Sequence, residues 1–134
     1  MAQAPLPNGA GGYQLGDGNL TEILMTTQPT PTAKTAAATL TPAELATGII
    51  TFNGTAGAFT VPLGADLDDA FQSMKVDSCF DFSIINTDGS DAATVTANTG
   101  CTLVGVAAVS ANSSCVWRVR KTGVATYVFY RIAG

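Results

Sequence analysis

The chain contains no histidine, and this absence removes several classes of active site at once. Ser-His and Cys-His nucleophile systems need an imidazole as general base, and many transition-metal sites use one as a ligand. A phosphate-binding G-x-x-x-x-G-K-[ST] loop is also missing, as is a G-x-G-x-x-G turn between a strand and a helix. We therefore expect no enzymatic activity and no cofactor.

Charged residues are scarce: they make up 12% of the chain, against roughly 25% in an average domain. Thr, Ser, Asn and Gly supply the polar surface instead, and such a surface loses less when it is buried against neighbouring copies. The net charge of −4 argues against a nucleic-acid partner, which needs a clustered positive footprint. No long apolar run indicates a membrane span or a signal peptide, so we expect a cytoplasmically made chain without a membrane partner.

Cysteine is rare as well. The three residues, Cys79, Cys101 and Cys115, are odd in number and form no C-x-x-C. This favours reduced, buried thiols, with one disulfide and a free thiol as the alternative.

Two acidic runs are the remaining candidates for chemistry. Asp66, Asp68 and Asp69 could hold a hard cation, and so could Asp88 and Asp91, although the second run lacks the distal Glu of a calcium loop. Helix capping explains Asp66 and a turn explains Asp88 without any metal. A glycosidase-like acid pair would need a cleft, of which the sequence gives no sign.

The first part of the chain has little that could build a core. We interpret residues 1–38, rich in Gly, Pro and Thr, as an extended N-terminal arm, and residues 39–134 as the folded domain. The arm contains one apolar patch, LTEILM, which is unusual for a disordered tail. We interpret the patch as an anchor that docks on another surface, with folding back onto its own subunit as the alternative. The predicted anchor residues are Tyr13, Leu20, Ile23, Leu24 and Met25.

Two helices are expected. The first lies within residues 39–48, because Thr41, Pro42 and Glu44 form a capping-box start and Gly48 suits a left-handed end. The second spans residues 63–75, where apolar residues recur at helical spacing. Its apolar face comprises Leu63, Leu67, Ala70, Phe71 and Met74.

The pattern of the remaining residues predicts short strands separated by turns. Residues 49–52 and 58–61 suggest a hairpin, and a second hairpin is expected at the C-terminus around residues 121–123. The other predicted strands are 79–86, 93–97, 101–105 and 106–110. Together these segments predict a mainly β fold, an antiparallel, jelly-roll-like β-sandwich with one or two short helices.

Aromatic and basic residues gather near the C-terminus. They could form a platform for single-stranded nucleic acid, but strand alternation puts Arg118 and Arg120 on one face and Trp117 on the other. We therefore expect a buried Trp117, and we expect Arg118 and Arg120 to form inter-subunit ion pairs with acids such as Asp66 or Asp69.

Four segments together resemble a family of tailed-bacteriophage capsid decoration, or cement, proteins: YQLGDGNLTE, TLTPAELATGIITFNGTAGAFTVPLGADLDDAF, MKVDSCFDFSIIN and WRVRKTGVATYVFYRIAG. The resemblance implies a homotrimer of β-sandwich subunits, made in the host cytoplasm and placed on the capsid surface of the virion. Its partners would be the major capsid protein and other copies of itself. The alternative is a trimeric head-fibre or tail component that contacts a host receptor or glycan.

Overall fold

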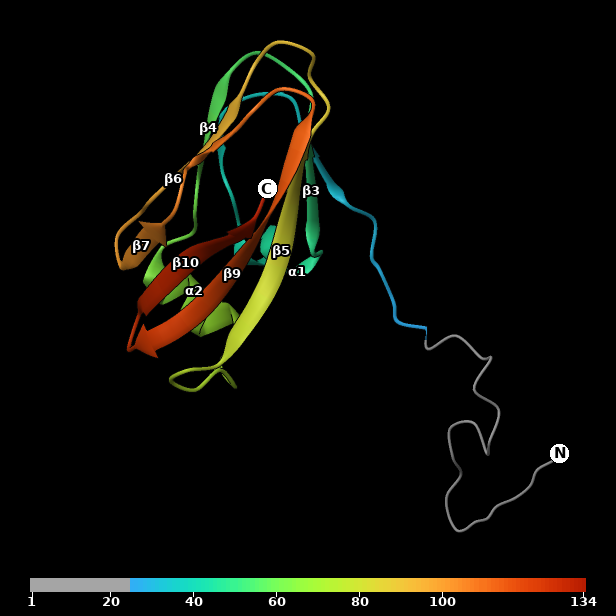
Figure 1. The fold of residues 1–134 in the computed structure, drawn as a ribbon. Coiled ribbons are helices and arrows are strands. Elements are labelled where there is room, and N and C mark those ends of the chain that lie inside the picture. The colour runs from blue at the N-terminus through green and yellow to red at the C-terminus, as the bar shows by residue number, and fades with distance from the viewer. Residues whose placement is uncertain (1–24) are drawn as a thin grey trace, which may run out of the picture.

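The computed structural model describes residues 25–134, and most of its regular structure is β-strand (Figure 1). The mainly β class predicted from the sequence is therefore confirmed. Residues 25–31 carry no helix or strand, are exposed throughout and lead away from the folded body. Neither helix of this described region has the length and apolar run that a membrane crossing requires.

The strands form two sheets. The first has six strands, in the order β1 (Thr32–Lys34), β3 (Ile49–Phe52), β5 (Cys79–Asn86), β9 (Ser113–Gly123), β10 (Thr126–Ala133) and β7 (Cys101–Val104). The second has four strands, in the order β2 (Ala38–Thr39), β4 (Gly57–Thr60), β6 (Ala93–Thr96) and β8 (Ala108–Val109). Strands β1 and β2 lie within the stretch predicted to be arm, so sheet structure begins at Thr32 rather than at residue 39.

Many strand pairs are parallel, which corrects the expectation of an antiparallel fold. From β1 to β8 the chain changes sheet at every strand, so neighbours within a sheet are not consecutive in sequence. The pairs β1–β3, β3–β5, β2–β4, β4–β6 and β7–β10 are parallel, whereas β5–β9, β9–β10 and β6–β8 are antiparallel. Hairpins give antiparallel neighbours, and repeated crossing between two sheets allows parallel ones.

The hairpin predicted from residues 49–52 and 58–61 is wrong for the same reason. Strand β3 lies in the six-stranded sheet and β4 in the four-stranded sheet, so the turn between them joins different sheets. The C-terminal hairpin of β9 and β10 is confirmed, but Gly123 still pairs with Thr126. The reversal therefore lies at Val124 and Ala125, beyond the predicted residues 121–123, which still belong to β9.

Helix α1 (Pro42–Ala46) begins at the predicted capping box. Thr41 Oγ1 accepts the Glu44 N–H at 3.2 Å, and Glu44 Oε1 accepts the Thr41 N–H at 3.0 Å. Gly48, just beyond the end of α1, has a positive φ of 83°. Helix α2 (Gly64–Ala70) ends earlier than predicted, with Phe71 as its C-cap. The Phe71 ring packs edge-on against the Phe80 ring, with 5.2 Å between the ring centres.

Buried side chains of both sheets form one hydrophobic cluster. Trp117, Phe129 and Phe82 contribute from the six-stranded sheet, and Phe59 and Val95 from the four-stranded sheet. Trp117 is fully buried, as predicted, while Arg118 on the opposite face of β9 is exposed. The period-two alternation of β9 therefore decides which of its side chains enter the core.

Two polar side chains connect the sheets. Asn86, at the end of β5, donates to the carbonyl of Val109 in β8 at 3.0 Å. Arg131 in β10 donates to the carbonyls of Val106 and Ala108 at 2.8 and 2.6 Å. The bond to the Val109 carbonyl is buried, so it satisfies a backbone group that would otherwise lack a partner.

Candidate functional site

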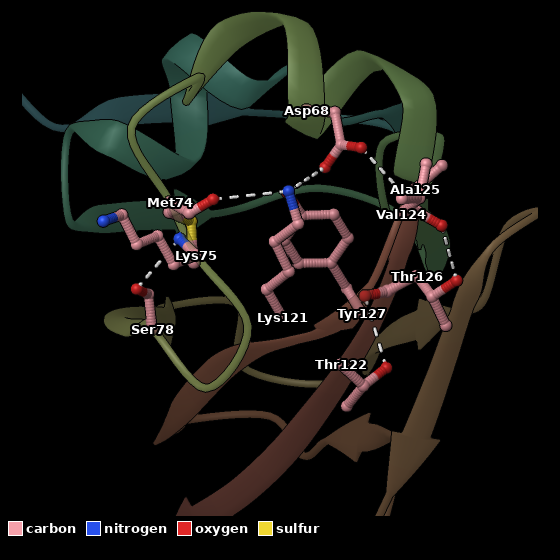
Figure 2. Close-up of polar contacts among 10 residues, drawn as sticks. All are labelled: Asp68, Met74, Lys75, Ser78, Lys121, Thr122, Val124, Ala125, Thr126 and Tyr127. Carbon is pink, nitrogen blue, oxygen red and sulfur yellow. Dashed lines mark hydrogen bonds and ion pairs between the residues drawn. The ribbon is translucent and has the colours of Figure 1, made fainter.

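One carboxylate, Asp68 on helix α2, ties the helix to the β9–β10 hairpin (Figure 2). Its Oδ1 accepts the Tyr127 hydroxyl at 2.6 Å and lies 2.9 Å from the Lys121 ammonium. The ammonium also donates to the Met74 carbonyl at 3.3 Å and lies 5.9 Å from the centre of the Tyr127 ring. Every polar atom of this cluster therefore has a partner in the same chain, which marks it as a structural clamp.

The clamp also fixes the turn between β9 and β10. Ala125 has a positive φ of 49°, a left-handed conformation that an L-residue adopts at a cost of about 1–2 kcal/mol. Its N–H donates to Asp68 Oδ2 at 2.7 Å. Its carbonyl oxygen lies against the backbones of Gly64 and Gly100, where there is no room for a Cβ. These contacts hold the turn in a conformation that Ala125 would not choose by itself.

Hydrogen bonds from Tyr127, Lys121 and the Ala125 N–H lower the pKa of Asp68 from its ordinary 3.8 to about 2. Burial and the bond to Asp68 raise the pKa of Tyr127. The carboxylate is therefore charged and the phenol neutral at any ordinary pH. This is the ionisation state that a hydrogen-bonded clamp requires.

We expect Asp68→Asn to make the free energy of unfolding depend less on pH under acidic conditions. The pKa of Asp68 is lower in the folded chain, so its stabilising contribution is present above 3.8 and is lost as the pH falls through about 2. Urea unfolding at neutral pH and at about pH 3 gives two free energies of unfolding, and their difference measures this dependence. Asp69→Asn, at an exposed neighbouring position, is the control, and its stability should change with pH as that of the native chain does. If the stability of Asp68→Asn changed with pH as that of the native chain does, the Asp68 carboxylate would not titrate as described.

An apolar groove opens on the surface among helix α1, the segment that follows helix α2 and the start of β5. Its volume is about 350 Å³, and it is lined mainly by Leu45, Ala46, Phe71, Met74, Cys79 and Phe80. Phe71, Met74 and Phe80 are partly buried and pack against the core. Core packing therefore fixes the bottom of the groove. Its volume is within the range of about 300–1,000 Å³ that is typical of binding pockets.

The two arginines predicted to pair between subunits find partners within the chain. Arg118 makes two bonds to Asp81, at 2.8 and 3.0 Å, because these residues face each other across β5 and β9. Arg120 binds Asp77 at 2.7 Å and the Tyr130 hydroxyl at 3.0 Å. Neither bond involves Asp66 or Asp69, the partners that we expected. Both ion pairs are solvent-exposed, so water and salt screen them and each adds little to the stability of the fold.

Most of the predicted anchor lies outside the described residues. Tyr13, Leu20, Ile23 and Leu24 belong to residues 1–24, which the structure does not describe. Met25 is described, and 82% of its surface is exposed. No contact of the patch with its own domain is therefore visible at Met25.

The turn predicted at Asp88 is confirmed, whereas Asp66 does not cap helix α2. Asp88 Oδ1 accepts the backbone N–H groups of Ser90 and Asp91 at 2.9 and 2.8 Å, which is turn chemistry. Asp66 lies in the first turn of α2, although Leu63 occupies the N-cap position and makes no side-chain cap bond. Within residues 25–134, no three His, Cys, Asp or Glu side chains gather as they would around a metal ion.

All three cysteines are free thiols. Cys101 and Cys115 are buried as predicted, and burial raises the pKa of Cys101 to about 11. Cys79 is exposed instead, because it begins β5 at the rim of the apolar groove. It is therefore the accessible thiol of the chain.

Reasoning from the sequence alone missed both the groove and the role of Asp68. The apolar spacing of Phe71 and Met74 was visible, but it predicted core contacts and gave no sign of a surface depression. Asp68 meets Tyr127 across 59 residues of sequence, so no local spacing indicates that contact. Comparison with known proteins adds no assignment: no family model, curated protein or solved structure matches this chain.

Proposed function

We propose that this chain is a virion structural protein, a decoration protein that binds the outside of an assembled phage head and stabilises its capsomer junctions. In this proposal the two sheets stack as a β-sandwich, and the subunits associate as a homotrimer. The shared hydrophobic cluster and the bonds of Asn86 and Arg131 between the sheets support the sandwich.

The observation that carries the proposal is the exposed chain that leads into the domain. Residues 25–31 are exposed at every position and leave the body near β1 (Figure 1). Ahead of them the sequence carries an apolar patch that ends in the exposed Met25. An extended segment of this kind can contact a surface well beyond its own domain and become ordered when it binds.

The distribution of positive charge supports a protein partner rather than a nucleic acid. All six basic residues lie in the described region, and four of them, Lys34, Arg118, Arg120 and Lys121, pair with carboxylates of the same chain. Arg131 binds backbone carbonyls. Little positive charge is therefore left to neutralise phosphates.

The buried aromatic residues favour decoration over the fibre or tail alternative. A component that binds a receptor or glycan is expected to expose aromatic side chains. Trp117, Tyr127 and Phe129 are instead fully buried, and the partly buried Phe71 and Phe80 pack against the core. A ligand that binds only the assembled lattice shifts the equilibrium toward the intact shell by mass action, and this requires no exposed aromatic platform.

Binding to purified heads tests the proposal. Heads of the phage that encodes the chain, stripped of this protein, should bind the full-length chain on their outer surface, and a particle reconstruction should place it between capsomers. Removing residues 1–24 keeps β1 and the Gln28 contact and should lower head occupancy while the domain stays folded. Density on the tail alone, or no binding, would refute the decoration role. Equal occupancy of the truncated chain would refute only the role of the arm.

A further inference from the structure

The apolar groove lies beside the point where the arm joins the domain. Gln28 Nε2 donates to the Thr47 carbonyl at 2.6 Å, and Thr47 directly follows Ala46, a lining residue of the groove. The arm therefore starts at the rim of a depression of about 350 Å³ with an apolar lining. The patch LTEILM ends only three residues before Gln28.

Met25, the last residue of the patch, nevertheless does not lie in the groove of its own chain. Met25 is 82% exposed, and the chain between Met25 and β1 leads away from the body (Figure 1). A chain of eight residues, the separation of Gln28 and Leu20, spans at most about 26–29 Å, enough to reach past the edge of a small domain. The described chain leaves the domain outward at Met25, so another molecule is within reach of the residues that precede it.

We propose that this groove binds residues 20–25 of a second copy of the chain. Leu20, Ile23, Leu24 and Met25 would place aliphatic side chains against Phe71, Met74 and Phe80. A contact between an arm and a groove uses different surfaces on the two copies, so it closes into a ring when the rotation allows, as in a trimer. The inference rests on the self-association named in the proposed function and assigns the patch to a neighbouring copy; binding to heads is measured separately, by occupancy of the stripped heads.

Cys79 provides a reporter for the occupant, because its exposed thiol lies in the groove while the other two cysteines are buried. A chain carrying Leu24→Cys and Cys79→Ser is mixed with the native chain bearing a mass tag, and a mild thiol oxidant is added. We expect a mixed disulfide between position 24 of one copy and Cys79 of the other, located by peptide mapping. Leu6→Cys with Cys79→Ser is the control and should form at least about tenfold less of this product.

A disulfide between position 24 and Cys79 also distinguishes binding to a second copy from folding back onto the same chain. When Leu24→Cys is made with Cys79 retained, exchange gives disulfide-linked multimers, whereas folding back closes a loop within one chain. A bond formed only within single chains, or no bond in the mixture, would overturn the proposal.

Solution mass gives an independent measurement on the full chain. We expect the native chain to self-associate, and Leu24→Asp to weaken that association at least about tenfold because a charge would enter the groove. Leu6→Asp, elsewhere in the arm, should leave the association unchanged. On the groove side, Ser73→Lys should weaken it, while Gln72→Lys, next to the lining, should not. A native chain that stays monomeric at all accessible concentrations would overturn the proposal.

Discussion

Replacing Gly64 with alanine should lower the free energy of unfolding by about 3 kcal/mol, because the new methyl group has no space. Gly64 is the buried first residue of α2, and a Cβ there would overlap the carbonyl oxygen of Ala125. Both groups are backbone-held: the Gly64 N–H donates to the Thr99 carbonyl at 3.0 Å, and Asp68 fixes the Ala125 turn. Neither side can move aside cheaply.

The sign of this change is informative, because helix propensity predicts the opposite. Alanine is favoured over glycine inside a helix by about 1 kcal/mol, so without the overlap Gly64→Ala would stabilise the chain. Urea unfolding of the variant measures the net effect. Gly123→Ala is the control: the nearest side-chain atoms would lie 3.9 Å from its Cβ, so we expect a change within about 0.5 kcal/mol. A stabilised Gly64→Ala chain would show that the hairpin is not packed against α2 as described.

Replacing Asn86 with alanine should cost a similar amount, about 3 kcal/mol. The side chain is 1% exposed and makes three hydrogen bonds. Its Nδ2 donates to the carbonyls of Asp91 and Val109 at 2.8 and 3.0 Å, and its Oδ1 accepts the Asp88 N–H at 3.0 Å. The truncation leaves the buried Val109 carbonyl unpaired, at a cost of about 1–3 kcal/mol, and removes the side-chain partner of the part-buried Asp91 carbonyl and Asp88 N–H.

Two further variants separate hydrogen bonding from packing at this position. Asn86→Asp keeps the shape but turns a carboxylate toward two carbonyls, so we expect it to be at least as destabilising near neutral pH. Asn53→Ala is the exposed control, since the Asn53 side chain makes no hydrogen bond within residues 25–134, and should change stability by less than about 0.5 kcal/mol. If thermal unfolding of Asn86→Ala matched that of Asn53→Ala, the bonds between β5 and β8 would carry no stability.

Local features of this chain were predictable from its sequence. The Thr41–Glu44 capping box acts within one helical turn, so its residues meet wherever the helix is placed. Strand β5 begins and ends at the predicted residues, and the alternation along β9 buries Trp117 and exposes Arg118. The scarcity of charge and the lack of histidine likewise limit the available chemistry, whichever way the chain folds.

The candidate interaction surfaces were harder to predict from the sequence. The arm and its patch are visible in the composition. The groove, however, needs helix α1, the segment after helix α2 and the start of β5 to meet, and Cys79 was expected to be buried. The partners of Arg118 and Arg120 follow from the register of β5 against β9, which places Asp81 opposite Arg118. No spacing between residues 81 and 118 in the sequence reveals that register.

By itself, the sequence determined the class of the fold, the start of α1 and the buried face of individual strands, because each depends on neighbouring residues and on a fixed period. The tertiary structure alone decided which strands pair, in which direction, and which distant side chains meet. An alternating pattern states which face of a strand is buried but not which strand lies beside it. The parallel β1–β3–β5 neighbours, the Asp68 clamp and the groove at Cys79 all depend on that second choice.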